Sequence, residues 1–247
     1  MSPDAIMAIF ACVVCVSYAV QTVTGFGSMV VCVTVGAHLL EIRELVTLAV
    51  PISLLQTSYI AMRHRDGIRW ELLLRRVLPA MCAGMAVAFA FFADAGGDWL
   101  RRAFALMVLV LGGLELWRMR RGAADTEARL SKGASMASMV GAGVIHGIYA
   151  TGGPLLVYAL SRERLSKGEF RSTLTMVWLL LSIVLLANFT YEGRYTGETL
   201  SRLLWLVPAL PVGVAFGEWL HNRVSERVFK VSVYGLLVAA AVTLLVR

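Results

Sequence analysis

Two polar residues, each followed by a turn rich in glycine, are the most informative feature of this chain. The stretch QTVTGFGSMVV runs from Gln21 to Val31, and the stretch HGIYATGGPLLV runs from His146 to Val157. Adding 125 to a position in the first stretch gives its counterpart in the second, so that Gln21 matches His146. Glycine turns inside apolar sequence leave backbone N–H and C=O groups unpaired, and a binding site is the simplest reason to tolerate that cost.

The order of residues after each turn predicts the start of a helix. Thr151, Gly152, Gly153 and Pro154 supply a capping hydroxyl, flexible glycines and an early proline, and Ser28 offers a hydroxyl in the first stretch. Two helix N-termini would converge near the membrane midplane from opposite leaflets, each with about half a positive charge and free N–H donors. All 16 acidic residues lie in connections or near segment ends, so the sequence predicts an anion site.

The predicted anion site combines backbone N–H groups near the glycines with polar side chains that complete the shell. For Gln21 and His146, hydrogen bonding between helices is the alternative role. Histidine titrates near neutral pH, which makes His146 the candidate for proton coupling. No catalytic residue, metal ligand or cofactor is predicted. The full set of predicted substrate-binding residues is Gln21, Thr24, Gly25, Gly27, Ser28, His146, Tyr149, Thr151, Gly152 and Gly153.

Composition places the protein in a membrane. Of its 247 residues, 58% are hydrophobic and only 16% are charged, which is atypical of a soluble domain of this length. The N-terminal segment lacks a basic region and a small-residue cleavage site, so we expect it to remain in the mature protein. Membrane lipids are therefore the first expected partner.

Ten apolar segments are predicted to enter the membrane, five on each side of the polar stretch 118–133. We expect an all-α polytopic fold of two inverted repeats, with a first repeat at 1–117, a cytoplasmic linker at 118–133 and a second repeat at 134–247. Each repeat begins with a glycine-broken hairpin that is too short for two full spans of about 20 residues and a turn. The segments cover 5–24, 26–40, 45–62, 72–93, 100–117, 134–150, 152–161, 172–190, 203–220 and 228–246.

The distribution of basic residues predicts the orientation. If the N-terminus lies outside, 17 of the 23 Lys and Arg residues fall in cytoplasmic connections, and the positive-inside rule favours that arrangement. Both termini are then outside, and the two repeats enter the membrane in opposite directions. The net charge of +7 is explained by this bias, so no nucleic-acid partner is predicted.

Other function classes fit the sequence less well. Cys12 and Cys15 form a C-x-x-C, but they lie within a membrane segment with no second cysteine pair or nearby histidine, so packing is the expected role. The four histidines are dispersed and no catalytic motif is present, which argues against an integral-membrane enzyme. An anion channel shares every feature of the site and stays the main alternative to a carrier.

The chain resembles the TauE/SafE family, also called the sulfite exporter or toluenesulfonate uptake permease family. The resemblance rests on the duplicated layout and on two motifs, Gly25-Phe26-Gly27 and Gly147 with Thr151-Gly152-Gly153-Pro154. Ser28-Met29 departs from the family pattern, in which glycine and later proline often follow. The resemblance implies transport of small sulfur-containing or organic anions, such as sulfite, sulfoacetate or another sulfonate, across the bacterial cytoplasmic membrane. The inverted repeats with broken helices predict a secondary transporter that works by alternating access.

Overall fold

The computed structural model describes residues 3–24, 27–63, 65–92, 98–121, 131–160, 163, 165–221, 223 and 226–246. These residues form helices, and no strand occurs among them. The helices overlap the ten predicted apolar segments, two of which, 72–93 and 203–220, overlap two α-helices each. Their bounds are α1 Pro3–Thr24, α2 Ser28–Gly36, α3 Ile42–Arg63, α4 Trp70–Leu72, α5 Leu78–Phe92, α6 Asp98–Arg121, α7 Lys132–Tyr149, α8 Gly153–Leu160, α9 Lys167–Tyr191, α10 Gly197–Leu206, α11 Ala209–His221 and α12 Glu226–Val246.

Two short irregular helices interrupt this pattern in the first half of the chain. A 3₁₀ turn, η1, covers Arg65–Gly67, and a π-helical turn, η2, covers Leu73–Val77 between α4 and α5. Within the described residues, five stretches are long and apolar enough to cross a membrane. They are Asp4–Val23, Ile42–Met62, Trp70–Phe92, Gly168–Tyr191 and Gly197–Leu220. The protein is therefore an all-helical polytopic membrane protein.

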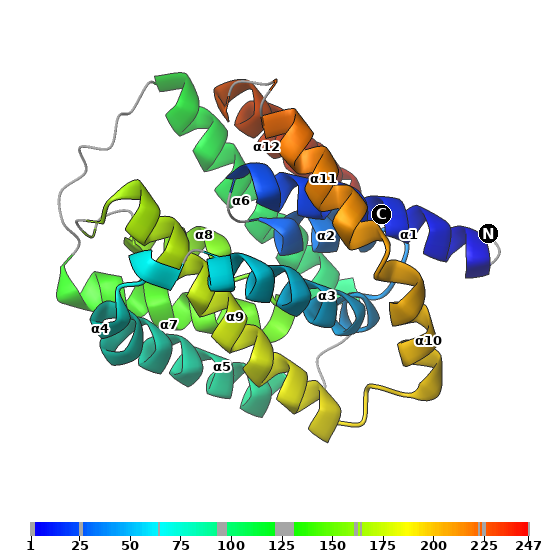
Figure 1. Ribbon diagram of the computed structural model, residues 1–247, viewed down its shortest axis with the longest axis horizontal. Coiled ribbons are helices and arrows are strands. Elements are labelled where there is room, and N and C mark those ends of the chain that lie inside the picture. Colours follow the sequence, from blue (N-terminus) through cyan, green and yellow to red (C-terminus); the bar gives the residue numbers. More distant parts are fainter. Residues whose placement is uncertain are drawn as a thin grey trace. The chain divides into compact units, whose positions relative to one another are not determined.

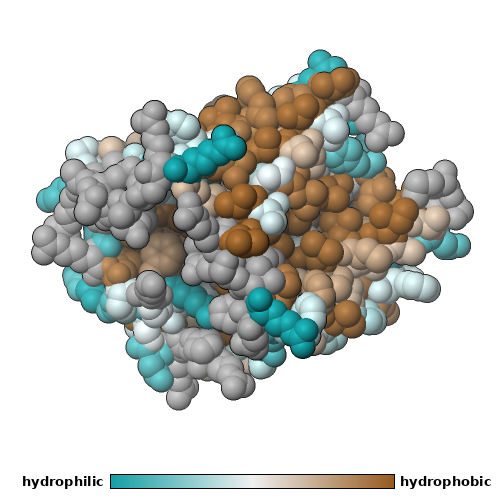
Figure 2. All heavy atoms as spheres, turned by 90° about the horizontal axis from the view of Figure 1, so that it is seen from above, coloured by the Kyte–Doolittle hydropathy of each residue, from teal (hydrophilic) through white to brown (hydrophobic). Residues whose placement is uncertain are grey.

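The exposed side chains are those expected beside lipid. On α10 and α11, the exposed fractions are 74% for Leu204, 72% for Trp205 and 60% for Val212. Figure 2 shows apolar residues gathered over much of the face that it draws. Because large apolar side chains at this exposure would be unfavourable in water, a bilayer is the environment that accounts for them.

Each hairpin consists of one long helix and one short helix. The first pairs α1, of 22 residues, with α2, of 9 residues, and the second pairs α7, of 18 residues, with α8, of 8 residues. At 1.5 Å per residue, α2 and α8 are about 12–14 Å long, less than half of a hydrocarbon core of about 30 Å. The short arms therefore cannot be complete spans, which agrees with the prediction of shortened hairpins.

The chain divides into two compact units, each assembled from both halves of the sequence. Unit 1 contains Met1–Ile52, Gly96–Ala124 and Arg194–Arg247, and unit 2 contains Ser53–Ala95 and Asp125–Gly193. Within unit 1, α1 packs against α11 and α6 packs against α12; within unit 2, α5 packs against α7 (Figure 1). Each hairpin thus packs on a helix that belongs to the other half of the chain.

Glycine allows these helix pairs to approach closely. A Cβ atom at Gly213 on α11 would lie 2.4 Å from the carbonyl oxygen of Cys15 on α1. In unit 2, a Cβ at Gly84 on α5 would lie 2.1 Å from the carbonyl oxygen of Val140 on α7. Backbone therefore contacts backbone at both crossings, which is the usual role of small residues between packed membrane helices.

Helix α3 carries a proline, Pro51, one residue before the boundary between the units. Proline has no N–H, so the carbonyl of Thr47, four residues earlier, loses its usual helical donor. The hydroxyl of Tyr195 donates a hydrogen bond to that carbonyl oxygen at 3.3 Å, and the hydroxyl of Tyr18 donates to the carbonyl of Ala49 at 3.2 Å. Two tyrosines in unit 1 thus stabilise the backbone around the proline.

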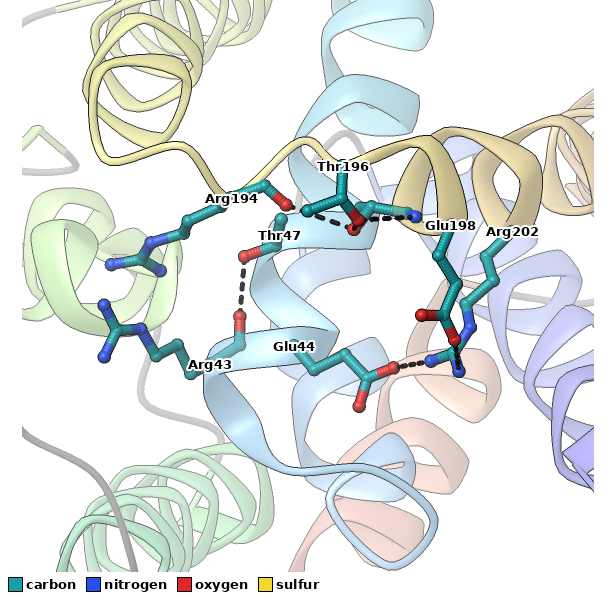
Figure 3. Close-up of polar contacts among 8 residues, drawn as sticks. Arg43, Glu44, Thr47, Arg194, Thr196, Glu198 and Arg202 are labelled. Carbon is teal, nitrogen blue, oxygen red and sulfur yellow. Dashed lines mark hydrogen bonds and ion pairs between the residues drawn. The ribbon is translucent and has the colours of Figure 1, made fainter.

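Ion pairs hold the beginnings of α3 and α9. In unit 1, Arg202 on α10 lies between two carboxylates and pairs with Glu44, the third residue of α3, and with Glu198 (Figure 3). In unit 2, Arg69 pairs with Glu169, the third residue of α9, at 3.0 Å. Because these pairs are partly exposed and screened by solvent, each contributes little to stability. Their main effect is to determine which segments pack together, because the pairs to Glu44 and Glu169 join residues that are far apart in the sequence.

Candidate functional site

The first hairpin turns at Gly27, which precedes α2. Its φ of +94° lies in the left-handed region, where a side chain would be strained, and the Gly27 carbonyl accepts a hydrogen bond from Val31 N–H at 3.0 Å. Two further predicted site residues come directly before this turn. Gly25 lies outside the described residues, and Thr24 ends α1 but its side chain is not among those described.

Gln21 and Ser28 meet across the first turn. Both are buried, with exposed fractions of 4% and 3%, and the Ser28 hydroxyl donates a hydrogen bond to Gln21 Oε1. The acceptor end of the amide is thus used within the hairpin. The Gln21 side chain keeps its Nε2 amide group, which can only donate. The structure therefore brings together two residues that the sequence predicted for the site.

The second hairpin has an equivalent contact across its turn. His146 is buried, with 3% of its surface exposed, and its Nδ1 accepts a hydrogen bond from the Gly152 N–H at 3.5 Å. A neutral imidazole that accepts at Nδ1 carries its hydrogen on Nε2. Among the described residues, that Nε2 is buried and has no hydrogen-bond partner. His146 therefore presents an unused donor inside the protein.

The start of α8 differs by one residue from the sequence interpretation. Gly152, rather than Thr151, directly precedes the helix, and its carbonyl accepts a hydrogen bond from Leu156 N–H at 3.2 Å. This bond matches that between Val31 and Gly27 at the offset of 125. Pro154 is the second residue of α8, as expected of an early proline. Thr151 itself is buried, with 3% exposed.

The two glycines of the second turn have different surroundings. A Cβ at Gly152 would lie 2.3 Å from the carbonyl oxygen of Ala142 on α7, so glycine here permits close packing within the hairpin. Apart from its chain neighbours and the backbone of its own helix, a Cβ at Gly153 would have one described atom within about 4 Å, which is Trp178 Cζ2 at 4.0 Å. The sequence predicted that both glycines allow a ligand to approach the backbone. In the structure, there is room for a ligand beside Gly153 but not beside Gly152.

Trp178 on α9 is the residue that sequence reasoning missed. Its indole stacks on the His146 imidazole, with ring centroids 5.4 Å apart and planes inclined by 26°. Tyr149, which was predicted for the site, is also buried, with 5% exposed. An aromatic residue within the apolar run 172–190 carries no periodic or motif signal, so only the packing of α9 identifies it.

The apolar part of each hairpin, which includes its turn, contains no formal charge; Asp4 and Lys132 lie at the outer ends of α1 and α7. Segments 5–40 and 134–161 hold no Asp, Glu, Lys or Arg. The described turns supply backbone N–H groups at the starts of α2 and α8, together with the donor ends of Gln21 and His146. Such an arrangement can bind an anion through hydrogen bonds and helix dipoles, and it has no carboxylate that would attract a cation.

The fold and the hairpins define a class of protein, the helical membrane transporters with broken helices. The family model of the sulfite exporter TauE/SafE matches residues 9–244, so this chain belongs to the TauE/SafE family, which is a family of membrane transporters. The probable inner membrane transporter protein TsaS of Comamonas testosteroni is 23% identical over 178 residues, which are 72% of this chain and 72% of that protein. The probable sulfite/organosulfonate exporter TauE of Cupriavidus necator is 22% identical over 234 residues, covering 91% and 88% of the two chains. No solved structure matches the chain.

Proposed function

We propose that this protein is a secondary transporter of a small sulfur-containing or organic anion, such as sulfite, sulfoacetate or another sulfonate. It moves the anion across the bacterial cytoplasmic membrane by alternating access, and it is not an enzyme. The name of the Cupriavidus necator relative, a probable sulfite/organosulfonate exporter, supports the substrate class, and the name of the Comamonas testosteroni relative supports a transporter of the inner membrane. The observation that carries the proposal is that a side-chain acceptor in each hairpin is used across the turn, at Gln21 Oε1 and at His146 Nδ1, while the buried His146 Nε2 has no hydrogen-bond partner among the described residues.

Each hairpin contributes its own set of donors in this proposal. In unit 1 these are the Gln21 amide and the backbone N–H groups of Gly27 and Ser28. In unit 2 they are His146 Nε2 and the backbone N–H group of Gly153, with Thr151 and Tyr149 nearby in sequence. Hydrogen bonds to a charged partner contribute about 1.5–3 kcal/mol each, so a few donors suffice to bind an anion without a buried cation.

Matched contacts in the two units support the proposed duplication. Cys15 and Val140 are 125 residues apart, and Gly84 and Gly213 are 129 apart; in each unit, the hairpin residue contacts the glycine that comes from the other half. Glu44 and Glu169 are also 125 apart, and each pairs with an arginine from the other half. Repeated contacts of this kind are expected of inverted repeats, which are the usual basis of alternating access.

Ligand-dependent thermal stability of the purified protein tests the proposed function. We expect sulfite and organosulfonates to raise the melting temperature, and sodium or choline at equal ionic strength to leave it unchanged, because a ligand stabilises the state that binds it. Gly153→Leu should abolish the shift, since the side chain would fill the space beside the α8 N-terminus. Gly113→Leu on α6 is the matched control, because nothing lies within 4 Å of its added Cβ. Equal stabilisation by anions in the wild type and Gly153→Leu would place the site elsewhere.

Cysteine labelling tests the proposed inverted orientation, with both termini outside. In a cysteine-free background, single cysteines at Glu41 and Gly197 should react with an impermeant maleimide from outside, and those at Glu71 and Gly168 from the cytoplasmic side. All four positions are exposed. Glu41 and Gly168 lie in the corresponding connections of the two repeats, before α3 and within the first turn of α9. Labelling of both from the same face would exclude inverted repeats.

A further inference from the structure

Trp178 lies at the border of the proposed site in unit 2. Its side chain is 9% exposed, and its neighbours on α9, Val177 and Leu181, are fully buried. Tryptophan has only two side-chain torsions, so a buried indole with fixed neighbours is a rigid surface. The position of this ring is therefore determined by the packing of α9 in unit 2.

The indole contacts both groups that the proposed site needs at the second turn. One contact is the stacking on His146, whose ring is also held by the Gly152 N–H. The other is the approach of Trp178 Cζ2 to within 4.0 Å of the position that a Gly153 Cβ would occupy. The same ring thus lies beside the unused His146 donor and beside the start of α8.

Gly153 and Trp178 together define how much room there is next to the helix start. At Gly152, one residue earlier, the backbone of α7 fills the space and leaves no room for a ligand. At Gly153, the nearest described group is a side chain, and the distance of 4.0 Å is an ordinary van der Waals contact. A group attached to an anion bound here would therefore meet the indole first.

We propose that Trp178 is a specificity-determining residue that limits the size of the organic group on the bound anion. This inference rests on the proposed function, because it assumes that an anion binds at the start of α8. The donors hold the anionic head, which all sulfonates share. The indole wall then separates small sulfonates from large ones, since a rigid aromatic surface cannot give way at little cost.

Binding constants for three sulfonates of increasing size test this inference. The probes are methanesulfonate, benzenesulfonate and naphthalene-2-sulfonate, titrated into the purified full-length protein in detergent and measured by calorimetry. In the wild type, affinity should fall as the group grows. Trp178→Leu should change the ratio of the methanesulfonate affinity to the naphthalene-2-sulfonate affinity by about tenfold or more in favour of the larger probe. This is the scale on which pocket size discriminates between ligands.

Two further variants keep the test decisive if Trp178→Leu does not fold. Trp178→Phe retains an aromatic ring of smaller size and should shift the ratio in the same direction by less. Gly153→Ala approaches the same space from α8 and should shift the ratio the other way, toward methanesulfonate. Trp70→Leu is the control, because Trp70 is a half-exposed tryptophan at the start of α4 in the same unit. The affinity ratio of this variant should equal that of the wild type.

The outcomes separate this inference from the proposed function. If the wild type binds none of the three probes, the anion site itself is wrong and the role of Trp178 is lost with it. If the wild type binds them and the Trp178 and Gly153 variants keep the wild-type ratio, only the inference about Trp178 is overturned. An equal loss of affinity for all three probes in Trp178→Leu and Trp178→Phe also overturns it, because that result would indicate a purely structural role for Trp178.

Discussion

Replacing Gly84 or Gly143 with leucine is expected to abolish recovery of folded protein. The added Cβ atoms would lie 2.1 Å from the carbonyl oxygen of Val140 and 2.2 Å from that of Met81, so α5 and α7 would have to separate. Overpacking costs about 1–3 kcal/mol even where side chains can move aside, and backbone cannot do so. The two helices are in extensive contact within unit 2, and their separation would expose side chains that are now buried.

Size-exclusion chromatography and thermal melting in detergent provide the measurement. We expect both variants to aggregate or to be absent from the membrane fraction, and alanine at the same positions to lower the melting temperature. Gly113→Leu should behave like the wild type, because the space around Gly113 is open. Wild-type melting of Gly84→Leu would show that α5 and α7 do not pack as closely as described.

The second large effect is expected at His146, and it concerns binding rather than folding. His146→Leu removes the Nε2 donor and should weaken anion binding by about 2 kcal/mol, roughly 30-fold, the scale of a hydrogen bond to a charged group. His146→Gln should retain most of the affinity. Its Oε1 can accept from the Gly152 N–H, as Gln21 Oε1 accepts from the Ser28 hydroxyl in the first hairpin, and its Nε2 can donate to the anion.

The glutamine variant also tests the proposed proton coupling through His146. Glutamine cannot titrate, so His146→Gln should bind the anion yet lose the dependence of transport on a pH gradient. Uptake into proteoliposomes with and without an imposed gradient is the measurement, and Gln21→His in the other hairpin is an informative companion variant. Retained gradient-driven transport in His146→Gln would remove His146 from the coupling mechanism and leave the anion site intact.

Local signals in the sequence were enough to predict the helices and the hairpin turns. Long apolar runs bounded by charged residues allow few conformations in a bilayer, because every backbone polar group must be paired. Glycine marks the turns for the same local reason, and Gly27 does adopt a positive φ. Gln21 and His146 were predicted because a polar side chain in an apolar run is conspicuous. The same motifs indicated the TauE/SafE family, and the family model matches residues 9–244.

Only the tertiary structure decided which helices meet and what each turn residue contacts. The pairing of α1 with α11 and of α7 with α5 joins segments far apart in the chain, and apolar runs of similar composition do not distinguish among partners. The different roles of Gly152 and Gly153 depend on which of them faces the backbone of α7. Trp178 became part of the candidate site because α9 packs its indole against His146, a long-range contact that hydrophobicity alone does not specify.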